Sequence, residues 1–288
     1  MLLGFLLFLA PQSAPAAQTG ADARLDQALV RLAAEASNFW HSAPGFIGQE
    51  TLTQKAIVPS KRRVRIGASA VEPYKPEFKD REIVSWYGLA GFQKAPEALR
   101  EFRRVISVDG KAQEDAAAAR AQLRTAIQSP DDRAKRLLAD QFEKIGLSGS
   151  ALDFGQLVLL FTRANIPKYS FLIADSGLVG AEKALVLQFR QRAGKESVHI
   201  SEGRKHTRAP LEGELWIRED DYRPLRITLT VVRQEQHDVE VQDDARVDYA
   251  PAAGASLPAS VVYRRFVNGQ LTAESSAQYS GWKPVDAP

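Results

Sequence analysis

The strongest constraint on the fold is a long stretch, residues 168–283, in which apolar and polar residues alternate along one predicted strand after another. Alternation with a period of two places one kind of side chain on each face of a strand, as in an antiparallel sheet with one wet and one dry face. Asn268-Gly269 between two such runs predicts a two-residue hairpin turn. Apolar residues on the dry faces of the clearest strands are Leu187, Phe189, Leu225, Ile227, Leu229 and Val231.

Helical periodicity appears in two other parts of the chain. Residues 25–40 carry an apolar stripe that includes Leu29 and Leu32, spaced as on one face of an α-helix. Residues 112–165 form a second helical block, in which Ser129 and Pro130 predict a helix start. Residues 152–161 form a buried helix or a strand, and the helix is favoured. Strands are expected between these helical parts, within residues 46–109, and residues 17–22 are expected to be a flexible N-terminus.

The order of helix, strands, helices and strands favours one α+β domain over residues 17–288, with the block at 112–165 between two strand sets. An apolar sheet face of this length must be covered to avoid aggregation. We therefore expect a large curved antiparallel sheet whose concave face is covered by the helices.

The N-terminus predicts export. An apolar run at residues 2–10 is too short to span a bilayer, and the small residues Ala14 and Ala16 fit a cleavage site, so residues 1–16 are interpreted as a signal peptide. A buried N-terminal helix is the alternative. The chain has no Cys, which excludes disulfides and thiolate metal sites. A bacterial periplasmic or secreted location is expected.

Charge and motifs exclude several function classes. The net charge of +3 does not indicate nucleic acid binding, and the basic run that begins at Lys61 is interpreted as a solvated face or a contact with anionic lipid. The motifs of metalloproteases, serine hydrolases and nucleotide-binding proteins are absent from the sequence. His199 and His206 could face each other across a hairpin, but they lack further ligands, so no metal and no cofactor are predicted. Asp243 either marks a bulge or points to the dry face, where it would need Arg246 or Arg265 as a partner.

Three segments resemble the LolA-like family of periplasmic lipoprotein carriers and outer-membrane-lipoprotein-sorting-like proteins. They are the hairpin at residues 213–229, which runs from Gly213-Glu-Leu-Trp-Ile to Arg223-Pro-Leu-Arg-Ile, the opening Gly45-Phe-Ile-Gly-Gln, and Leu257-Pro-Ala-Ser-Val-Val. The resemblance implies an incomplete β-barrel with helices on its open side. It also implies a hydrophobic cavity suited to an acyl chain, a lipid or a lipoprotein.

The resulting hypothesis is a monomeric, non-enzymatic protein that binds or carries a hydrophobic ligand in the cell envelope. Its cavity-lining candidates are Leu187, Phe189, Leu225, Ile227, Leu229, Val231, Leu29 and Leu32. Two alternatives stay open: a module with a filled core that binds another envelope protein, and a hydrolase with an unrecognised site.

Overall fold

The computed structural model describes residues 16–58, 77–147, 153–194, 198–202, 205–235, 238–252 and 254–287, without the side chains of 16–21, 97 and 198–208. The predicted signal peptide, except for Ala16, and the basic run beginning at Lys61 lie outside the described residues. None of the helices in the described ranges combines the length and the apolar character that a bilayer span requires.

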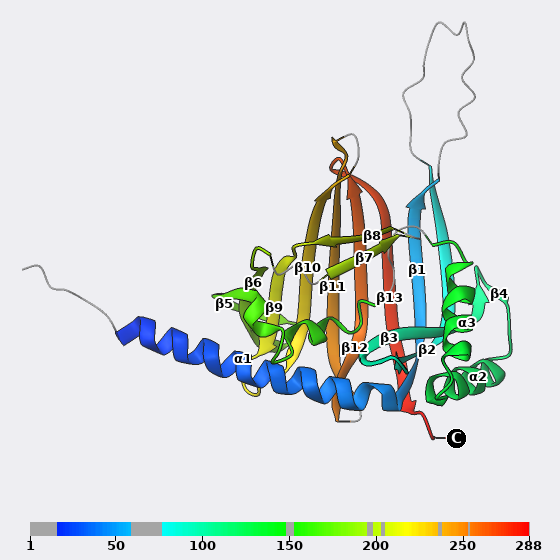
Figure 1. Cartoon of the computed structure of the whole chain (residues 1–288), viewed down its shortest axis with the longest axis horizontal. Helices are drawn as coiled ribbons and strands as arrows, with labels where there is room; N and C mark the ends of the chain where they lie inside the picture. Colours follow the sequence, from blue (N-terminus) through cyan, green and yellow to red (C-terminus); the bar gives the residue numbers. More distant parts are fainter. Residues whose placement is uncertain are drawn as a thin grey trace, which may run out of the picture.

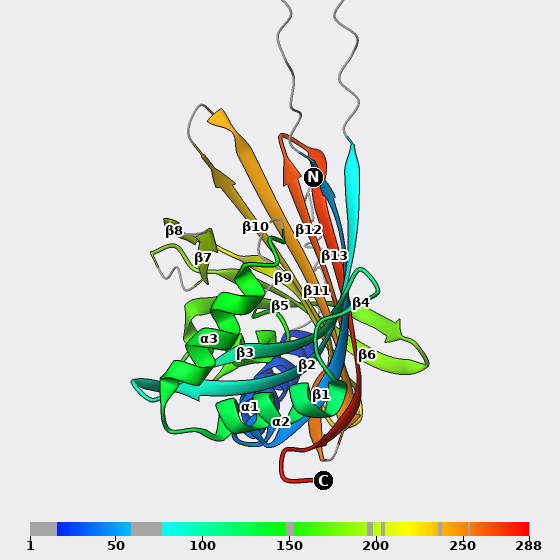
Figure 2. The ribbon, with the colours of Figure 1, turned by 90° about the vertical axis from the view of Figure 1, so that its right-hand side faces the viewer.

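Eleven antiparallel strands form one open, curved sheet, which confirms the predicted fold class (Figures 1 and 2). Neighbouring strands follow the order β4-β3-β2-β1-β13-β12-β11-β10-β9-β6-β5, so that β4 and β5 are its edges. The strands are β1 (Phe46–Ile57), β2 (Phe78–Phe92), β3 (Ala95–Val108), β4 (Lys111–Ala112), β5 (Tyr169–Val179), β6 (Glu182–Gln191), β9 (Glu212–Arg218), β10 (Pro224–Gln234), β11 (Glu240–Ala252), β12 (Ala255–Val267) and β13 (Gln270–Pro284).

Two turns show how local sequence sets the strand connections. Asn268 and Gly269 have φ values of 50° and 75°, which suit the predicted two-residue hairpin between β12 and β13. Gly213 begins the hairpin of β9 and β10, where a Cβ atom would lie 2.0 Å from the carbonyl oxygen of Thr228. Only glycine allows the two strands to approach so closely at this point.

The helix α1 (Ala16–Ser42) crosses the concave side of the sheet (Figures 1 and 2). Its apolar stripe buries Ala28, Leu32, Ala36 and Phe39, whereas Val30 on the opposite side is 71% exposed. The prediction of a flexible N-terminus at residues 17–22 is wrong, because the helix already begins at Ala16. The short helix η1 (Ala43–Gly45) then joins α1 to β1.

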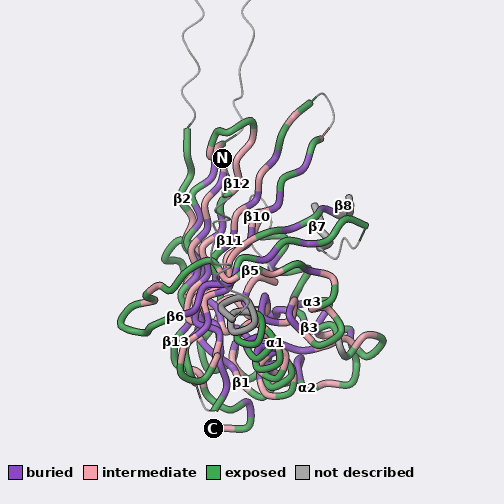
Figure 3. The backbone as a smooth tube through the Cα atoms, turned by 90° about the vertical axis from the view of Figure 1, so that its left-hand side faces the viewer, coloured by how far each residue is buried: buried purple, intermediate pink, exposed green. Residues whose placement is uncertain are grey.

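A second covering layer comes from the short helices η2 (Leu157–Phe161) and η3 (Ile166–Lys168). The predicted helix over residues 152–161 is a single 3₁₀ segment within the described part, η2, which packs between α1 and β10. Figure 3 shows many buried residues where α1 lies against the sheet.

The helices α2 (Ala116–Gln128) and α3 (Asp132–Glu143) pack on β2 and β3 and make a smaller core there. The predicted start of α3 is corrected: Asp131, not Ser129, is its N-cap, because the Asp131 side chain accepts the backbone N–H of Arg133.

A separate two-stranded sheet consists of β7 (Val198–Glu202) and β8 (Lys205–Ala209). It lies between β6 and β9 in the sequence, where a continuous meander was expected, and it contacts β10.

Candidate functional site

The eight apolar residues proposed from the sequence lie between the sheet and its covering helices. Leu187 and Phe189 come from β6, and Leu29 and Leu32 come from α1. Seven of the eight side chains are buried, and Leu29 is half-buried at the margin of the main core. The four on β10 are Leu225, Ile227, Leu229 and Val231. The alternation in β6 and β10 therefore did identify the covered face of the sheet.

The Phe161 ring of η2 fills part of the space above these strands. The Phe161 ring lies with its centroid 5.0 Å from that of Phe189 and 5.9 Å from that of Tyr169, in tilted or edge-on arrangements that favour ring contact. The Phe39 ring of α1 meets Tyr249 of β11 edge-on at 6.5 Å. All five rings belong to the main apolar core.

A buried ionic cluster occupies the other part of the concave face, on β1, β2 and β3. The Arg103 guanidinium donates to both carboxylate oxygens of Glu50, at 2.6 and 2.8 Å, and to Glu101 at 2.7 Å. None of the three side chains is more than 2% exposed. Because a buried charge is costly unless it is paired, the ion pairs of Arg103 fix β1 and β3 relative to the strand between them.

The same cluster holds the loop that leads into η2. Glu101 accepts backbone N–H groups from Asp153 at 2.8 Å and from Gly155 at 2.7 Å, as well as the Tyr87 hydroxyl at 2.9 Å. A Cβ atom on Gly155 would lie 2.7 Å from that hydroxyl oxygen, so glycine is needed for this approach. Further along, the Val158 N–H donates to the Tyr249 hydroxyl at 3.1 Å. The covering segment is thus attached to the sheet by directional bonds.

Burial shifts the pKa values of two residues that attach this loop, Tyr87 and Asp153. Burial raises the pKa of Tyr87 well above its usual value, and the neighbouring Glu101 carboxylate raises it further. The hydroxyl therefore stays protonated and remains a hydrogen-bond donor. Burial, followed by the charge of Glu101, also raises the pKa of Asp153, despite the nearby Arg100.

A second polar group on the concave face centres on Asp243 of β11. Its carboxylate accepts from Arg265 Nε at 2.8 Å, from the Tyr263 hydroxyl at 2.5 Å and from Arg233 Nη1. The predicted partner Arg265 is confirmed, but Arg246 is not a partner: it pairs with Asp248. Burial opposes ionisation of Asp243, and the hydrogen bonds from Arg265 and Tyr263 outweigh it, so its pKa lies below the usual value.

The turn between β9 and β10 holds the N-terminal half of α1 through exposed or half-exposed charges. Arg24 pairs with Glu219 at 3.3 Å, and their side chains are 44% and 29% exposed. Burial raises the pKa of Glu35, which Arg223 partly opposes and Asp221 reinforces. This acidic hairpin turn therefore contacts the helix, in addition to joining two strands.

The sequence reasoning did not find the ionic cluster, although a signal was present. Glu50 and Gln54 occupy the same face of β1 as the buried Leu52 and Ala56. A carboxylate in phase with buried apolar residues predicts a buried ion pair. The partner Arg103 lies on β3, so only the pairing of both β1 and β3 with β2 brings the charges together.

Histidine and acidic residues give no metal site in the described part of the chain, where no group of three or more His, Cys, Asp or Glu is suitably placed. His199 pairs with Arg208 across the β7–β8 hairpin, whereas His206 lies opposite Ser201. The hairpin is therefore present, but the two His are not directly opposite each other.

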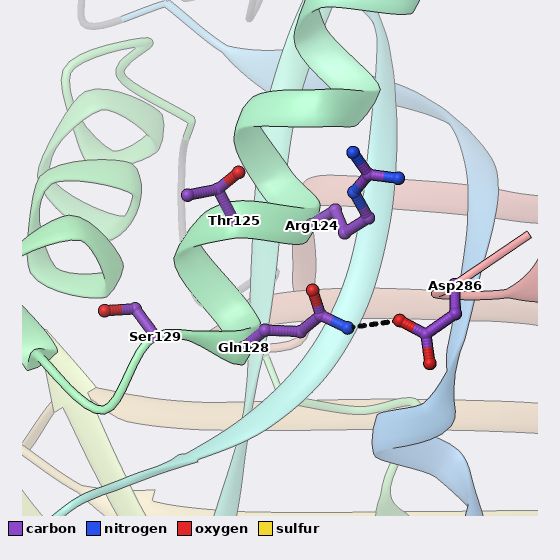
Figure 4. A pocket seen from close by; sticks show the side chains of 5 residues that line it. All are labelled: Arg124, Thr125, Gln128, Ser129 and Asp286. Carbon is purple, nitrogen blue, oxygen red and sulfur yellow. Dashed lines mark hydrogen bonds between the residues drawn. The ribbon is translucent and has the colours of Figure 1, made fainter. Parts of the chain in front are cut away.

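Two surface depressions in the described part of the chain lie away from the eight apolar residues. One, of about 480 Å³, lies beside the C-terminal end of α2 and is lined by Arg124, Thr125, Gln128, Ser129 and Asp286 (Figure 4). Gln128 Nε2 donates to the Asp286 carboxylate at 2.7 Å across it. Another, of about 380 Å³, lies between α2 and α3 and includes Leu137. Polar, mostly exposed walls such as those in Figure 4 do not favour an apolar ligand.

Comparisons with known proteins yield two similar solved structures. No protein-family model and no curated protein sequence matches the chain. One structure is described as an outer membrane lipoprotein-sorting protein domain from Vibrio parahaemolyticus, with 9% identity, a TM-score of 0.38 and coverage of 91% of this chain and 94% of that one. The other is a DUF1329 family protein from Desulfovibrio piger ATCC 29098, with 10% identity, a TM-score of 0.39 and coverage of 93% and 94%. The first bears a description of the kind that the sequence resemblance named.

Proposed function

We propose that this chain binds an apolar ligand of the acyl-chain type between the concave face of its sheet and α1. The observation that carries the proposal is the position of α1, which lies across an open curved sheet and contacts it through an apolar stripe. A long helix attached mainly by apolar contacts can exchange them for contacts with an apolar ligand, because the hydrophobic effect is non-directional. The ligand would contact the side chains of Leu29, Leu32 and the six candidates on β6 and β10.

The connections of α1 suit such an exchange. The helix joins the sheet through η1 at its C-terminal end, and its N-terminal half is held by the Arg24–Glu219 pair. An exposed ion pair of this kind contributes at most about 1 kcal/mol. Movement of the N-terminal half would therefore open the apolar layer while β1 and the ionic cluster stay in place.

A crosslink tests this proposal directly. The chain has no Cys, so Arg24→Cys/Glu219→Cys introduces the only two thiols, which a short bifunctional maleimide can join. The uncrosslinked double variant should bind a fluorescent fatty acid as the unmodified protein does, and crosslinking should reduce that binding. Each single Cys variant treated with the same reagent is the control. Native mass spectrometry with lipid extraction should show co-purified lipid, and absence of any lipid or probe binding would sink the proposal.

A second candidate function is favoured by the aromatic rings of η2, β5 and β6. Phe161, Tyr169 and Phe189 already occupy the apolar layer, which is what a protein-binding module with a filled core requires. Such a protein would bind no probe but would bind an envelope protein through its surface. Crystals grown with a fatty acid distinguish the two functions, since only a ligand-binding protein would show the acyl chain beneath α1.

Export to a bacterial envelope is part of the proposal and rests on the apolar run and the Ala14 and Ala16 cleavage pattern. N-terminal sequencing of the protein recovered from a periplasmic fraction should find a chain that begins after Ala16. Recovery of the uncleaved chain from the cytoplasm would overturn it. We assign no catalytic step to the chain.

A further inference from the structure

The two edges of the large sheet differ in length and protection. The edge strand β4 has only two residues and is followed directly by α2, which packs on β2 and β3. The edge strand β5 has eleven residues, and no strand in the described ranges pairs with its outer side. Exposed strand edges present unpaired N–H and C=O groups that another strand can bind.

The hydrogen bonds of β5 show which backbone groups face outward. The Arg192 N–H donates to the Lys168 carbonyl, which makes Tyr169 and Gln191 a non-hydrogen-bonded pair of the ladder. The register continues with Phe171 opposite Phe189 and Ile173 opposite Leu187. Because the pattern alternates, the N–H and C=O groups of Phe171 and Ile173 point away from β6, toward the outer side of the edge. The Arg192 side chain bonds the Tyr169 carbonyl at 2.9 Å and marks one end of this stretch.

The side chains of β5 do little to prevent pairing. Residues 169–174 carry no charge and no proline, and they include Phe171, Leu172 and Ile173. Leu172 is 63% exposed, and Phe171 and Ile173 are half-buried at the margin of the main core. Natural edge strands are usually protected by charges or proline, so this stretch is an exception.

We propose that β5 binds β5 of a second copy of this chain, antiparallel and across a two-fold axis at Phe171. A two-fold axis perpendicular to the sheet keeps the concave faces on the same side, so each inward residue must lie opposite an inward residue. Phe171 then lies opposite its symmetry mate, Tyr169 opposite Ile173, and Ser170 opposite Leu172. The outward backbone groups of Phe171 bond those of its mate.

Charges at both ends of the stretch favour this register. Ala174 is the extra residue of a β-bulge, because Ile173 lies opposite Leu187 while Asp175 lies opposite the next residue, Val186. The bulge puts Asp175 on the convex face, in line with Lys168 of the second copy. The Lys168 ammonium donates to Asn165 at 2.8 Å and has further donors for a carboxylate. Two Lys168–Asp175 pairs would therefore flank the contact, and Leu172 would lie diagonal to its mate.

The same features distinguish a second copy from an unrelated extended peptide. A peptide without this charge pattern would leave Lys168 and Asp175 without their opposite charges, whereas the symmetric pairing matches each with the other. Since the strands share only about five residues per copy, the buried area is small and the dimer is expected to depend on concentration.

Sedimentation velocity of the full chain over a roughly thousandfold concentration range tests the proposal. The chain should pass from monomer to dimer. Asp175→Lys, which places two lysines together on each side, should weaken the dimer about tenfold. Lys168→Asp/Asp175→Lys exchanges the charges and should restore the dimer. Asp140→Lys on α3 makes the same charge change at an exposed position away from the edge and should leave the dimer unchanged.

Leu172→Glu provides a second, independent variant, because its exposed side chain can change without loss of core packing. It should also weaken the dimer, since two carboxylates would lie diagonal to each other. A chain that stays monomeric throughout, or a dimer that the charge exchange does not restore, would overturn the proposal. So would a monomer that binds an extended apolar peptide at β5.

Discussion

Apart from the polar group around Asp243, the concave face of the sheet has two parts that differ in their chemistry. On β6, β9 and β10 the face beneath α1 and η2 consists of buried apolar side chains such as Leu187 and Ile227, although η2 itself is also hydrogen-bonded to Tyr249 of β11. On β1, β2 and β3 the strands are joined by the ion pairs of Arg103 with Glu50 and Glu101. Apolar contacts can be replaced by another apolar surface, but a buried ion pair cannot be opened without exposing unpaired charge. The first part is therefore the part suited to bind a ligand, and the second is the rigid frame.

The largest effect is expected from breaking the frame. Arg103→Gln leaves Glu50 and Glu101 buried without their cation and should lower the free energy of unfolding by about 3–5 kcal/mol. Arg104→Gln is the matched control, because its pair with Glu114 is partly exposed and should contribute less than about 1 kcal/mol. Urea denaturation measures both. Equal losses in the two variants would mean that the ionic cluster is not the frame.

A smaller effect is expected from the apolar part. Leu32→Ala removes a fully buried side chain from the α1 stripe and should cost roughly 2–4 kcal/mol. Val30→Ala, on the exposed side of the same helix, should change stability by less than about 0.5 kcal/mol. Hydrogen exchange should show α1 opening before β1 to β3 in the Leu32 variant. If α1 and β1 to β3 lost hydrogen-exchange protection together, the two parts would not differ in rigidity.

The dependence of stability on acidic pH tests the polar group around Asp243. The pKa of Asp243 is lower in the folded chain than in the unfolded one. A lowered carboxyl pKa gives stability that is present above the ordinary value, about 3.9, and is lost as pH falls through the folded value. Asp243→Asn should therefore flatten the loss of stability below about pH 4 in thermal denaturation. Asp244→Asn, on the opposite face of the same strand, is the control. If Asp243→Asn lost stability below pH 4 as steeply as the wild type, the ionised Asp243 carboxylate would not be the cause of that loss.

Glu35 on α1 should give the smallest effect, of opposite sign. Burial raises its pKa, so its contribution to stability is present at low pH and declines as pH rises through the folded value. Glu35→Gln should remove that decline and be equal to or slightly more stable than the wild type at neutral pH, within about 0.5 kcal/mol. Glu143→Gln on α3 is the control. A variant that loses stability at neutral pH would show that the Glu35 charge stabilises α1.

Some elements followed from local pattern and others did not. The strands β10 to β13, the turn at Asn268 and the stripe of α1 were predicted, because each depends on neighbouring residues in one element. The extension of α1 back to Ala16, the 3₁₀ conformation of η2 and the separation of the β7–β8 hairpin from the large sheet were not predicted. Weak periodicity in these segments leaves their conformation to contacts with the rest of the chain.

The sequence by itself determined a large one-sided sheet and an amphipathic helix that must cover it, because the periods of two and 3.6 are properties of single elements. Only the tertiary structure decided which polar residues are buried together. Glu50, Arg103 and Asp243 come from different strands, and their partners are set by strand order and register. Tertiary structure also decided which strand lies at the long edge. Strand order depends on contacts between residues far apart in the sequence, which no local pattern specifies.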